Sequence, residues 1–193
     1  MAMYSSSLRR HSWQIGVGFR VSHERKVQAI MNTSAPTLPT LSDLDESAAM
    51  TVADALKIIL ANSYAIYLKT KNFHWHVSGP YFRDYHLLLD EQAAEILAVT
   101  DAIAERARKT GNTTIRSIGD IARHQTIKDN DAEFVTPQDM LAELRADNLH
   151  MVESFRRAKD VADMAKDNAT SGLIDTWTDE AERRAWFLFE ISR

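Results

Sequence analysis

One stretch of this chain, residues 81–109, contains neither proline nor glycine, while Pro80 precedes it and Gly111 follows it. This punctuation predicts a single long helix from about residue 81 to residue 109. Successive residues of a helix are rotated by about 100° around its axis, and four polar side chains fall within one sector of roughly 100° around that axis. They form an acidic stripe that includes one histidine: His86, Asp90, Asp101 and Glu105.

The opposite face of the same helix is apolar. Its side chains fall at roughly 200–300° from His86, which is where a helix packed on one side buries its core residues. They are Leu88, Leu89, Ile96, Val99 and Ile103. The helix is therefore predicted to present the stripe outward.

Histidine and carboxylate side chains are ligands of iron, manganese and zinc, but one helix cannot close this stripe around one ion. The eleven residues from Asp90 to Asp101 span about 16 Å at 1.5 Å per residue, whereas metal–ligand bonds are about 2 Å long. In residue number, the midpoint between His86 and Glu105 is 95.5, and the midpoint between Asp90 and Asp101 is the same. An antiparallel second copy crossing near Glu95 and Ile96 would set His86 against Glu105 and Asp90 against Asp101. Such a two-fold contact predicts two equivalent sites per dimer.

The simplest alternative is a solvated acidic face. Two details of the sequence weigh against it. Ala94, Leu97 and Ala98 lie on the same face between the carboxylates, which favours close packing at its centre. In addition, His86 stands one turn from Asp90, a placement that an ordinary solvated face does not require.

Composition narrows the chemistry. The 193 residues are enough for one domain with a real core, and 45% of them are hydrophobic. The chain has no cysteine, so a metal site must use nitrogen and oxygen ligands. Its net charge is −4; residues 1–30 carry +4 and residues 31–193 therefore carry −8. No apolar run approaches the roughly 18 residues of a membrane span, so we expect no membrane partner.

Residues 1–45 look separate from the rest and are expected to be a flexible N-terminal segment. Residues 1–30 are rich in serine and arginine, and three explanations stay open: a transit peptide, a translation start at Met31, or a genuine basic arm. We rank the start at Met31 first, in which case residues 1–30 are absent from the mature protein. Pro36 and Pro39 indicate a flexible lead-in to the folded part.

Residues 46–193 are predicted to form one all-α domain, a four-helix bundle with a short extra helix between its second and third helices. The long helices are expected at about 50–76, 81–109, 137–166 and from the region of Gly172 to the end. The short helix is expected within residues 113–123. Thr136 and Pro137 are typical of a helix start, as N-cap and first helical residue.

His74 and Trp75 end the first long helix, and the short break that follows folds His74 back toward the stripe. Trp75 is expected to shield the site, while the role of His76 stays open between surface residue and outer ligand. The usual di-iron bundle carries Glu-xx-His motifs, and this chain has none. Its nearest match, Asp147-xx-His150, is interpreted as a surface pair, so a site between subunits is favoured over one inside the bundle.

Three segments together resemble the Dps family of ferritin-like mini-ferritins. They are residues 71–79 (KNFHWHVSG), 85–91 (YHLLLDE) and 101–106 (DAIAER), and an aromatic-rich last helix ends in residues 186–190 (WFLFE). The resemblance covers about residues 45–193. The combination is specific, although no single segment is.

The resemblance implies a cytoplasmic, hollow dodecamer built from two-fold dimers, with ferroxidase sites at the dimer interfaces. Its metal ligands would be His74, His86 and Asp90 from one subunit and Asp101 and Glu105 from the other. Such proteins take up Fe(II), oxidise it preferably with hydrogen peroxide or else with dioxygen, and store Fe(III) as mineral.

Two further expectations concern iron entry and DNA. Asp175, Asp179 and Glu182 recur along one stripe of the last helix and are candidates for an acidic pore; an exposed helix face is the alternative. The alternative function is a nucleoid-associated DNA-binding protein that uses the basic arm. If the chain starts at Met31, we expect little direct DNA binding, because a subunit with a net charge of −8 repels the phosphates of DNA. A third reading is a bundle whose stripe is merely surface.

Overall fold

The computed structural model describes residue 40 and residues 42–193, and within that part of the chain it contains helices and no strand. The helices are α2 (Glu46–His76), α3 (Phe82–Ala98), α4 (Thr100–Lys109), α5 (Ile118–His124), α6 (Pro137–Met164) and α7 (Asn168–Glu190). The expected flexible segment and its start-site alternatives lie almost entirely outside the described residues.

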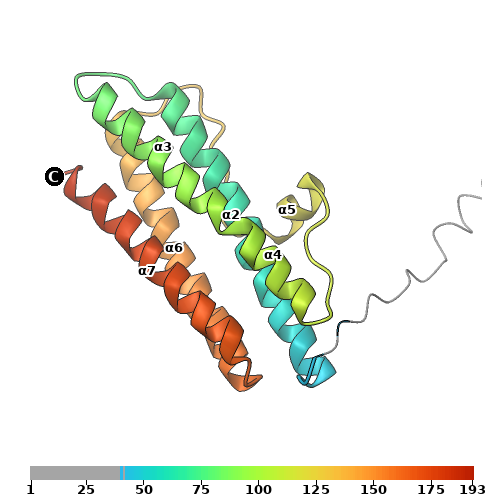
Figure 1. Ribbon diagram of the computed structural model, residues 1–193. Coiled ribbons are helices and arrows are strands. Elements are labelled where there is room, and N and C mark those ends of the chain that lie inside the picture. The colour runs from blue at the N-terminus through green and yellow to red at the C-terminus, as the bar shows by residue number, and fades with distance from the viewer. Residues whose placement is uncertain (1–39, 41) are drawn as a thin grey trace, which may run out of the picture. The chain divides into compact units, whose positions relative to one another are not determined.

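The long helices form a four-helix bundle, as Figure 1 shows. α3 and α4 continue along one line and together act as one arm of the bundle, beside α2. α6 and α7 pack against each other, and α2 also contacts α4, α5 and α6. The short α5 lies between the second and third long helices in chain order. The prediction of an all-α bundle with one extra helix in this connection is confirmed.

Side-chain caps mark the starts of α2, α6 and α7, whereas α3 begins without one. The Asp45 carboxylate accepts a hydrogen bond from the Ala48 amide at 3.0 Å, so α2 begins about four residues before the predicted start. The Thr136 hydroxyl accepts from the Asp139 amide at 3.2 Å, and Pro137 opens α6 as predicted. The start of α6, whose cap was recognised in the sequence, is therefore predicted correctly, whereas the start of α2, whose cap Asp45 was not singled out, is not.

The predicted helix over residues 81–109 is interrupted at Val99, the single residue between α3 and α4. The Thr100 hydroxyl donates a hydrogen bond to the Leu97 carbonyl at 2.7 Å, and such local bonds compete with the helical ladder. The Ile103 amide still bonds the Val99 carbonyl at 3.1 Å, so the two pieces keep their common direction. The stripe consequently stays on one side of the arm.

The boundary between the last two helices lies earlier than Gly172 suggests, because Gly172 is inside α7. α6 ends at Met164, and Lys166 adopts a left-handed backbone with φ 58°. The Asp167 amide then bonds the Ala162 carbonyl at 2.9 Å, which closes the helix end in the manner usually left to glycine. The sequence misleads here because a lysine holds the turn position.

The core fills the side of the α3–α4 arm that the sequence predicts. Leu89, Ile96 and Ile103 are at most 2% exposed, whereas Leu88 and Val99 are half-buried at its edge. α2 supplies much of the remaining core. It is the one described helix long and apolar enough to cross a membrane, with a mean hydropathy of 1.2 over 18 residues, but 56% of that window is buried in the bundle. This burial accounts for its apolar composition as a central bundle helix.

A buried ion pair joins the end of the α3–α4 arm to the turn before α7. Arg106 donates to the Asp167 carboxylate at 2.6 Å and to the Thr170 hydroxyl at 2.7 Å. Asp167 also caps α7 by accepting from the Thr170 amide at 3.0 Å. Burial would raise the pKa of Asp167, but the hydrogen bonds from Arg106 and Thr170 outweigh it and lower the pKa.

We predict that Asp167→Ala lowers the free energy of unfolding by about 2–4 kcal/mol at pH 7, because it removes a helix cap and leaves Arg106 without its partner. The pKa of Asp167 is lowered on folding, so its contribution is complete above the unfolded pKa of about 3.9 and is lost as the pH falls through the folded pKa. Denaturation of both proteins from pH 7 down to pH 3 measures the difference. A gap that does not narrow toward acid would contradict the assignment.

Candidate metal centre

His74 at the end of α2 and His86 in the second turn of α3 lie against each other. Their rings stack with centroids 3.8 Å apart and planes inclined by 20°. His74 is buried and His86 is half-buried. The short break between the two helices, with Gly79 at φ 105°, folds α3 back so that these two side chains meet. The juxtaposition expected for His74 is thus present.

Each ring of this pair is held by the backbone of the other residue. The His74 Nδ1 lies 2.8 Å from the His86 carbonyl oxygen, and the His86 Nδ1 lies 2.9 Å from the His74 carbonyl oxygen. A carbonyl oxygen can only accept, so both Nδ1 atoms must carry the proton and donate. In the neutral form of each ring the lone pair is then on Nε2, which is the tautomer that outer partners impose on histidines that bind a metal through Nε2.

Asp90, one turn after His86 on α3, lies beside this pair. Its Oδ1 is 3.9 Å from the His74 Nε2 and 2.7 Å from the Lys71 Nζ. The hydrogen bond from Lys71 is the main reason why the pKa of Asp90 lies below its usual value, with smaller help from the two histidines. His74 thus has the His86 ring stacked on one side and the Asp90 carboxylate near its Nε2. Imidazole and carboxylate are donor types that suit a divalent transition metal.

Asp101 and Glu105 lie on α4, beyond the break at Val99, and both are exposed. The Glu105 carboxylate accepts from the Lys109 ammonium at 3.0 Å, one turn away. Within the described residues of one chain, no group of three or more potential ligands surrounds a single point. The structure thus brings together His74, His86 and Asp90 and leaves Asp101 and Glu105 apart.

The face between these two groups is open in a single chain. Ala94, Leu97 and Ala98 are all exposed, Leu97 by 40%. Ile96 is buried, and Glu95 points toward α7, where it pairs with Arg183. The residues available for contact at the predicted crossing point are therefore the small and apolar ones. The shared two-fold site stays a prediction.

Two side chains at this site were not singled out from the sequence. Lys71 lies one turn before His74 on α2, and the Phe82 ring lies 5.0 Å from the His86 ring. Phe82 precedes His86 by four residues on one helix, and this spacing could have indicated the contact. Trp75 is 59% exposed in the single chain. Its shielding role stays a prediction.

The interior of the bundle holds cations of its own. The Lys69 ammonium is almost fully buried and lies 2.8 Å from both the Glu143 and the Asp147 carboxylates. Burial would lower the pKa of Lys69, but these two carboxylates outweigh it and raise the pKa. The Asp147 side chain is only 13% exposed, so the interpretation of Asp147 and His150 as a surface pair is wrong for Asp147. His150 instead contacts the Thr126 hydroxyl at 2.7 Å.

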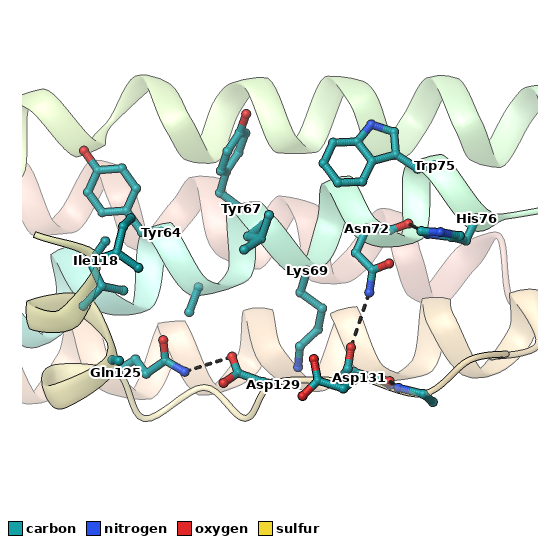
Figure 2. A pocket seen from close by; sticks show the side chains of 16 residues that line it. Tyr64, Tyr67, Lys69, Asn72, Trp75, His76, Ile118, Gln125, Asp129 and Asp131 are labelled. Atoms are coloured by element: carbon teal, nitrogen blue, oxygen red, sulfur yellow. Dashed lines mark hydrogen bonds between the residues drawn. The ribbon is translucent and has the colours of Figure 1, made fainter. Parts of the chain in front are cut away.

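A cavity of about 760 Å³ lies between α2, α5 and the connection that follows α5. Figure 2 shows Tyr64, Tyr67 and Trp75 on α2 and Ile118 on α5 around it, with Lys69 deeper. His76 lines it as well, and its Nδ1 bonds the Asn72 carbonyl of its own helix at 2.7 Å. Neither His74 nor His86 lines this space, so the candidate metal centre is not in the cavity.

The three pore candidates on α7 are exposed, as a stripe on that helix requires. Two of them are paired within the chain: Asp175 with Lys159 at 3.0 Å and Glu182 with Arg156 at 2.7 Å. Both basic partners lie on α6. The pore assignment stays a prediction.

A family model described as the ferritin-like domain matches residues 53–192. Together with the bundle and its histidine pair, this match defines a ferritin-like protein. DNA protection during starvation protein 1 of Deinococcus radiodurans is 30% identical over 148 residues, covering 77% of this chain and 72% of that protein. The chain belongs to the Dps family.

Further comparisons agree with this placement. The DNA protection during starvation protein of Brevibacillus brevis is 31% identical over 137 residues, covering 71% of this chain and 91% of that protein. The crystal structure of Dps from Thermosynechococcus elongatus superposes with a TM-score of 0.74 at 28% identity, covering 76% of this chain and 93% of that one.

We predict that His86→Ala weakens the binding of Co(II), a redox-inert probe under anaerobic conditions, by more than about tenfold. Loss of even an outer partner of a metal ligand costs roughly 10–100-fold in affinity, and His86 is a predicted ligand. His76→Ala is the matched control, since its ring faces its own helix and the cavity. Calorimetry and the visible absorption of Co(II) measure both variants, and equal losses in the two would remove the basis for the assignment.

Proposed function

We propose that this chain is a ferroxidase and iron-storage subunit that assembles into a dodecameric shell from two-fold dimers. Its substrate is Fe(II), and hydrogen peroxide is the preferred oxidant over dioxygen. His74, His86 and Asp90 of one subunit and Asp101 and Glu105 of the next are the proposed ligands. Membership in the Dps family, the pairing of His74 with His86 and the closeness of Asp90 to His74 support the proposal.

The histidine pair is the observation that carries the proposal. Two stacked imidazoles with both Nδ1 atoms committed to carbonyl oxygens leave their Nε2 atoms for a metal ion. A purely structural histidine pair would have no need of an ionised carboxylate beside it, yet Asp90 stands 3.9 Å from one Nε2. Nitrogen and carboxylate ligands bind both Fe(II) and Fe(III), so the ion can lose an electron in place.

A second subunit completes the site in this proposal. The fixed rise of a helix keeps Asp101 and Glu105 about 16 Å or more from Asp90 in one chain. The exposed small residues between them suit a close antiparallel contact with a second copy, as the shared midpoint predicts. Each interface would then hold two equivalent sites.

The reaction balances without free radicals. Two Fe(II) ions each give one electron to hydrogen peroxide, the O–O bond breaks, and with two protons the products are two Fe(III) ions and two water molecules. Hydroxyl radical is not released, because both electrons reach the same peroxide molecule. Fe(III) then hydrolyses to mineral inside the acidic shell, which Fe(II) enters past the pore candidates Asp175, Asp179 and Glu182.

The names of the relatives mention DNA protection during starvation. Consumption of Fe(II) and peroxide would protect DNA without contact, in the cytoplasm. Direct binding through residues 1–30 is the alternative function, and that arm lies outside the described residues. Residues 31–193 carry a net charge of −8, so without residues 1–30 the subunit would be repelled by the phosphates of DNA.

We predict that Asp101→Ala slows peroxide-dependent Fe(II) oxidation by more than about tenfold while the oligomer mass stays unchanged, because it removes a ligand from an exposed helix face. The matched control is Asp84→Ala, the same substitution on α3 but off the stripe. Stopped-flow absorbance of Fe(III) and native mass spectrometry supply the two readouts. Wild-type rates for Asp101→Ala in an intact oligomer would rule out the proposed ligand set.

We predict that mixed oligomers of His86→Ala and Glu105→Ala subunits recover activity that neither parent has. At an interface between unlike subunits, one site receives His86 from one chain and Glu105 from the other and is intact, while the second site lacks both. Subunits are dissociated, mixed in varied ratios and reassembled before assay. Recovery should peak near equal ratios; its absence would indicate that all ligands come from one chain.

A further inference from the structure

A lysine ammonium is held inside the bundle by two carboxylates of a neighbouring helix. The Lys69 Nζ of α2 lies 2.8 Å from the Glu143 Oε1 and 2.8 Å from the Asp147 Oδ2, both on α6. The Lys69 side chain is only 4% exposed and the Asp147 side chain 13%. Lysine is almost never buried this far unless it is paired. The position is therefore a cation site whose cation is attached to the chain.

Another lysine of α2 forms a much looser contact and serves as a comparison. Lys57 pairs with Asp54 at 2.9 Å, one turn away on its own helix, and the Asp54 side chain is 69% exposed. An exposed pair of this kind is weak, and water replaces either partner readily. The contact of Lys69 instead joins two helices and brings two carboxylates to one nitrogen.

The two carboxylates would be costly to keep charged in this place without a cation. Glu143 and Asp147 are four residues apart on α6, and like charges at that spacing repel each other. Burial raises the pKa of Asp147, and the hydrogen bond from Lys69 is the main cause that opposes this. Without the ammonium, the ionised pair would carry a charge of −2, which one divalent cation would balance. Carboxylates completed by water are a common ligand set of such ions.

An ion could reach this place, because Lys69 is part of the lining of the cavity between α2 and α5. Figure 2 shows Lys69 extending from α2 toward the connection after α5, which carries Asp129 and Asp131. Both aspartates are exposed and line the same cavity. Acidic residues along a cavity attract cations. The ammonium thus lies at the inner end of a route that favours positive ions.

We propose that Lys69 is a specificity-determining residue that excludes divalent cations from the bundle interior, because its ammonium takes the place between Glu143 and Asp147 that a metal ion would otherwise occupy. A covalently attached cation cannot be displaced from the chain, whatever the concentration of free metal. Metal binding is thereby left to the candidate metal centre. Only the identity of the excluded ion as Fe(II) rests on the proposed function; the exclusion itself goes beyond it.

The test counts the Co(II) ions bound by the assembled oligomer, by anaerobic calorimetry, in a His86→Ala background that weakens the candidate metal centre. Lys69→Met keeps the stem and removes the charge, so one additional Co(II) per subunit should bind. Lys69→Arg retains a cation and should bind no additional ion. Asp147→Asn added to Lys69→Met should abolish the gain. Lys57→Met is the matched control, and it should also leave the count unchanged.

Metal-dependent stability gives a second readout, because loss of the ammonium leaves buried carboxylates unpaired and destabilises the fold. Each tenfold rise in free Co(II) above its Kd should raise the Tm of Lys69→Met by about 3–6 °C, with no such rise for Lys57→Met. A folded Lys69→Met oligomer without an additional Co(II), or a Lys69→Met chain that stays unfolded at every Co(II) concentration, would overturn the inference. Neither result bears on the proposed function, which His86→Ala tests in chains that retain Lys69.

Discussion

The reciprocal pair of hydrogen bonds between His74 and His86 is the interaction on which the candidate site depends. Each ring donates to the main chain of the other residue, so the end of α2 and the second turn of α3 hold each other in register. The pair fixes the break between the helices, the tautomer of both rings and the position of Asp90 one turn on.

The interior of the bundle explains why the proposed metal ligands lie at its surface. Lys69 and its two carboxylates fill one interior position, and Arg184 fills another, donating to Asn148 at 2.9 Å and lying 3.8 Å from Glu95. Burial lowers the pKa of Arg184, although the neighbouring Glu95 opposes this. Buried ion pairs add little net stability, but removing one partner is costly. With these cations in place, the interior carboxylates are neutralised and unavailable to a metal ion.

The sequence predicts regular features of this molecule well because helical periodicity and capping chemistry are local. The apolar face of the α3–α4 arm and the cap at Thr136 follow from spacing alone. Interactions between helices are predicted poorly, because nothing in the spacing along one helix reports on its neighbour. The predicted surface position of Asp147 is wrong because Lys69 of α2 pairs with it, and the contact of Lys71 with Asp90 joins residues 19 apart. The contact of His74 with α3 is an exception, because the short break that follows α2 indicated that the chain turns back there.

The acidic stripe links chemistry to assembly. In one chain Asp90 and Glu105 are more than half exposed and face water, where the attraction between a carboxylate and a cation is strongly screened. An antiparallel contact through Ala94, Leu97 and Ala98 would bury apolar surface and bring the carboxylates into a drier environment at the same step. Small side chains at the centre permit a close approach of the two helices, and that approach sets the distance between the two half-sites. If the proposed function holds, the same residues that favour association would also determine whether a metal ion can be held. An unassembled subunit would then bind Fe(II) weakly and would not oxidise it outside the proposed shell.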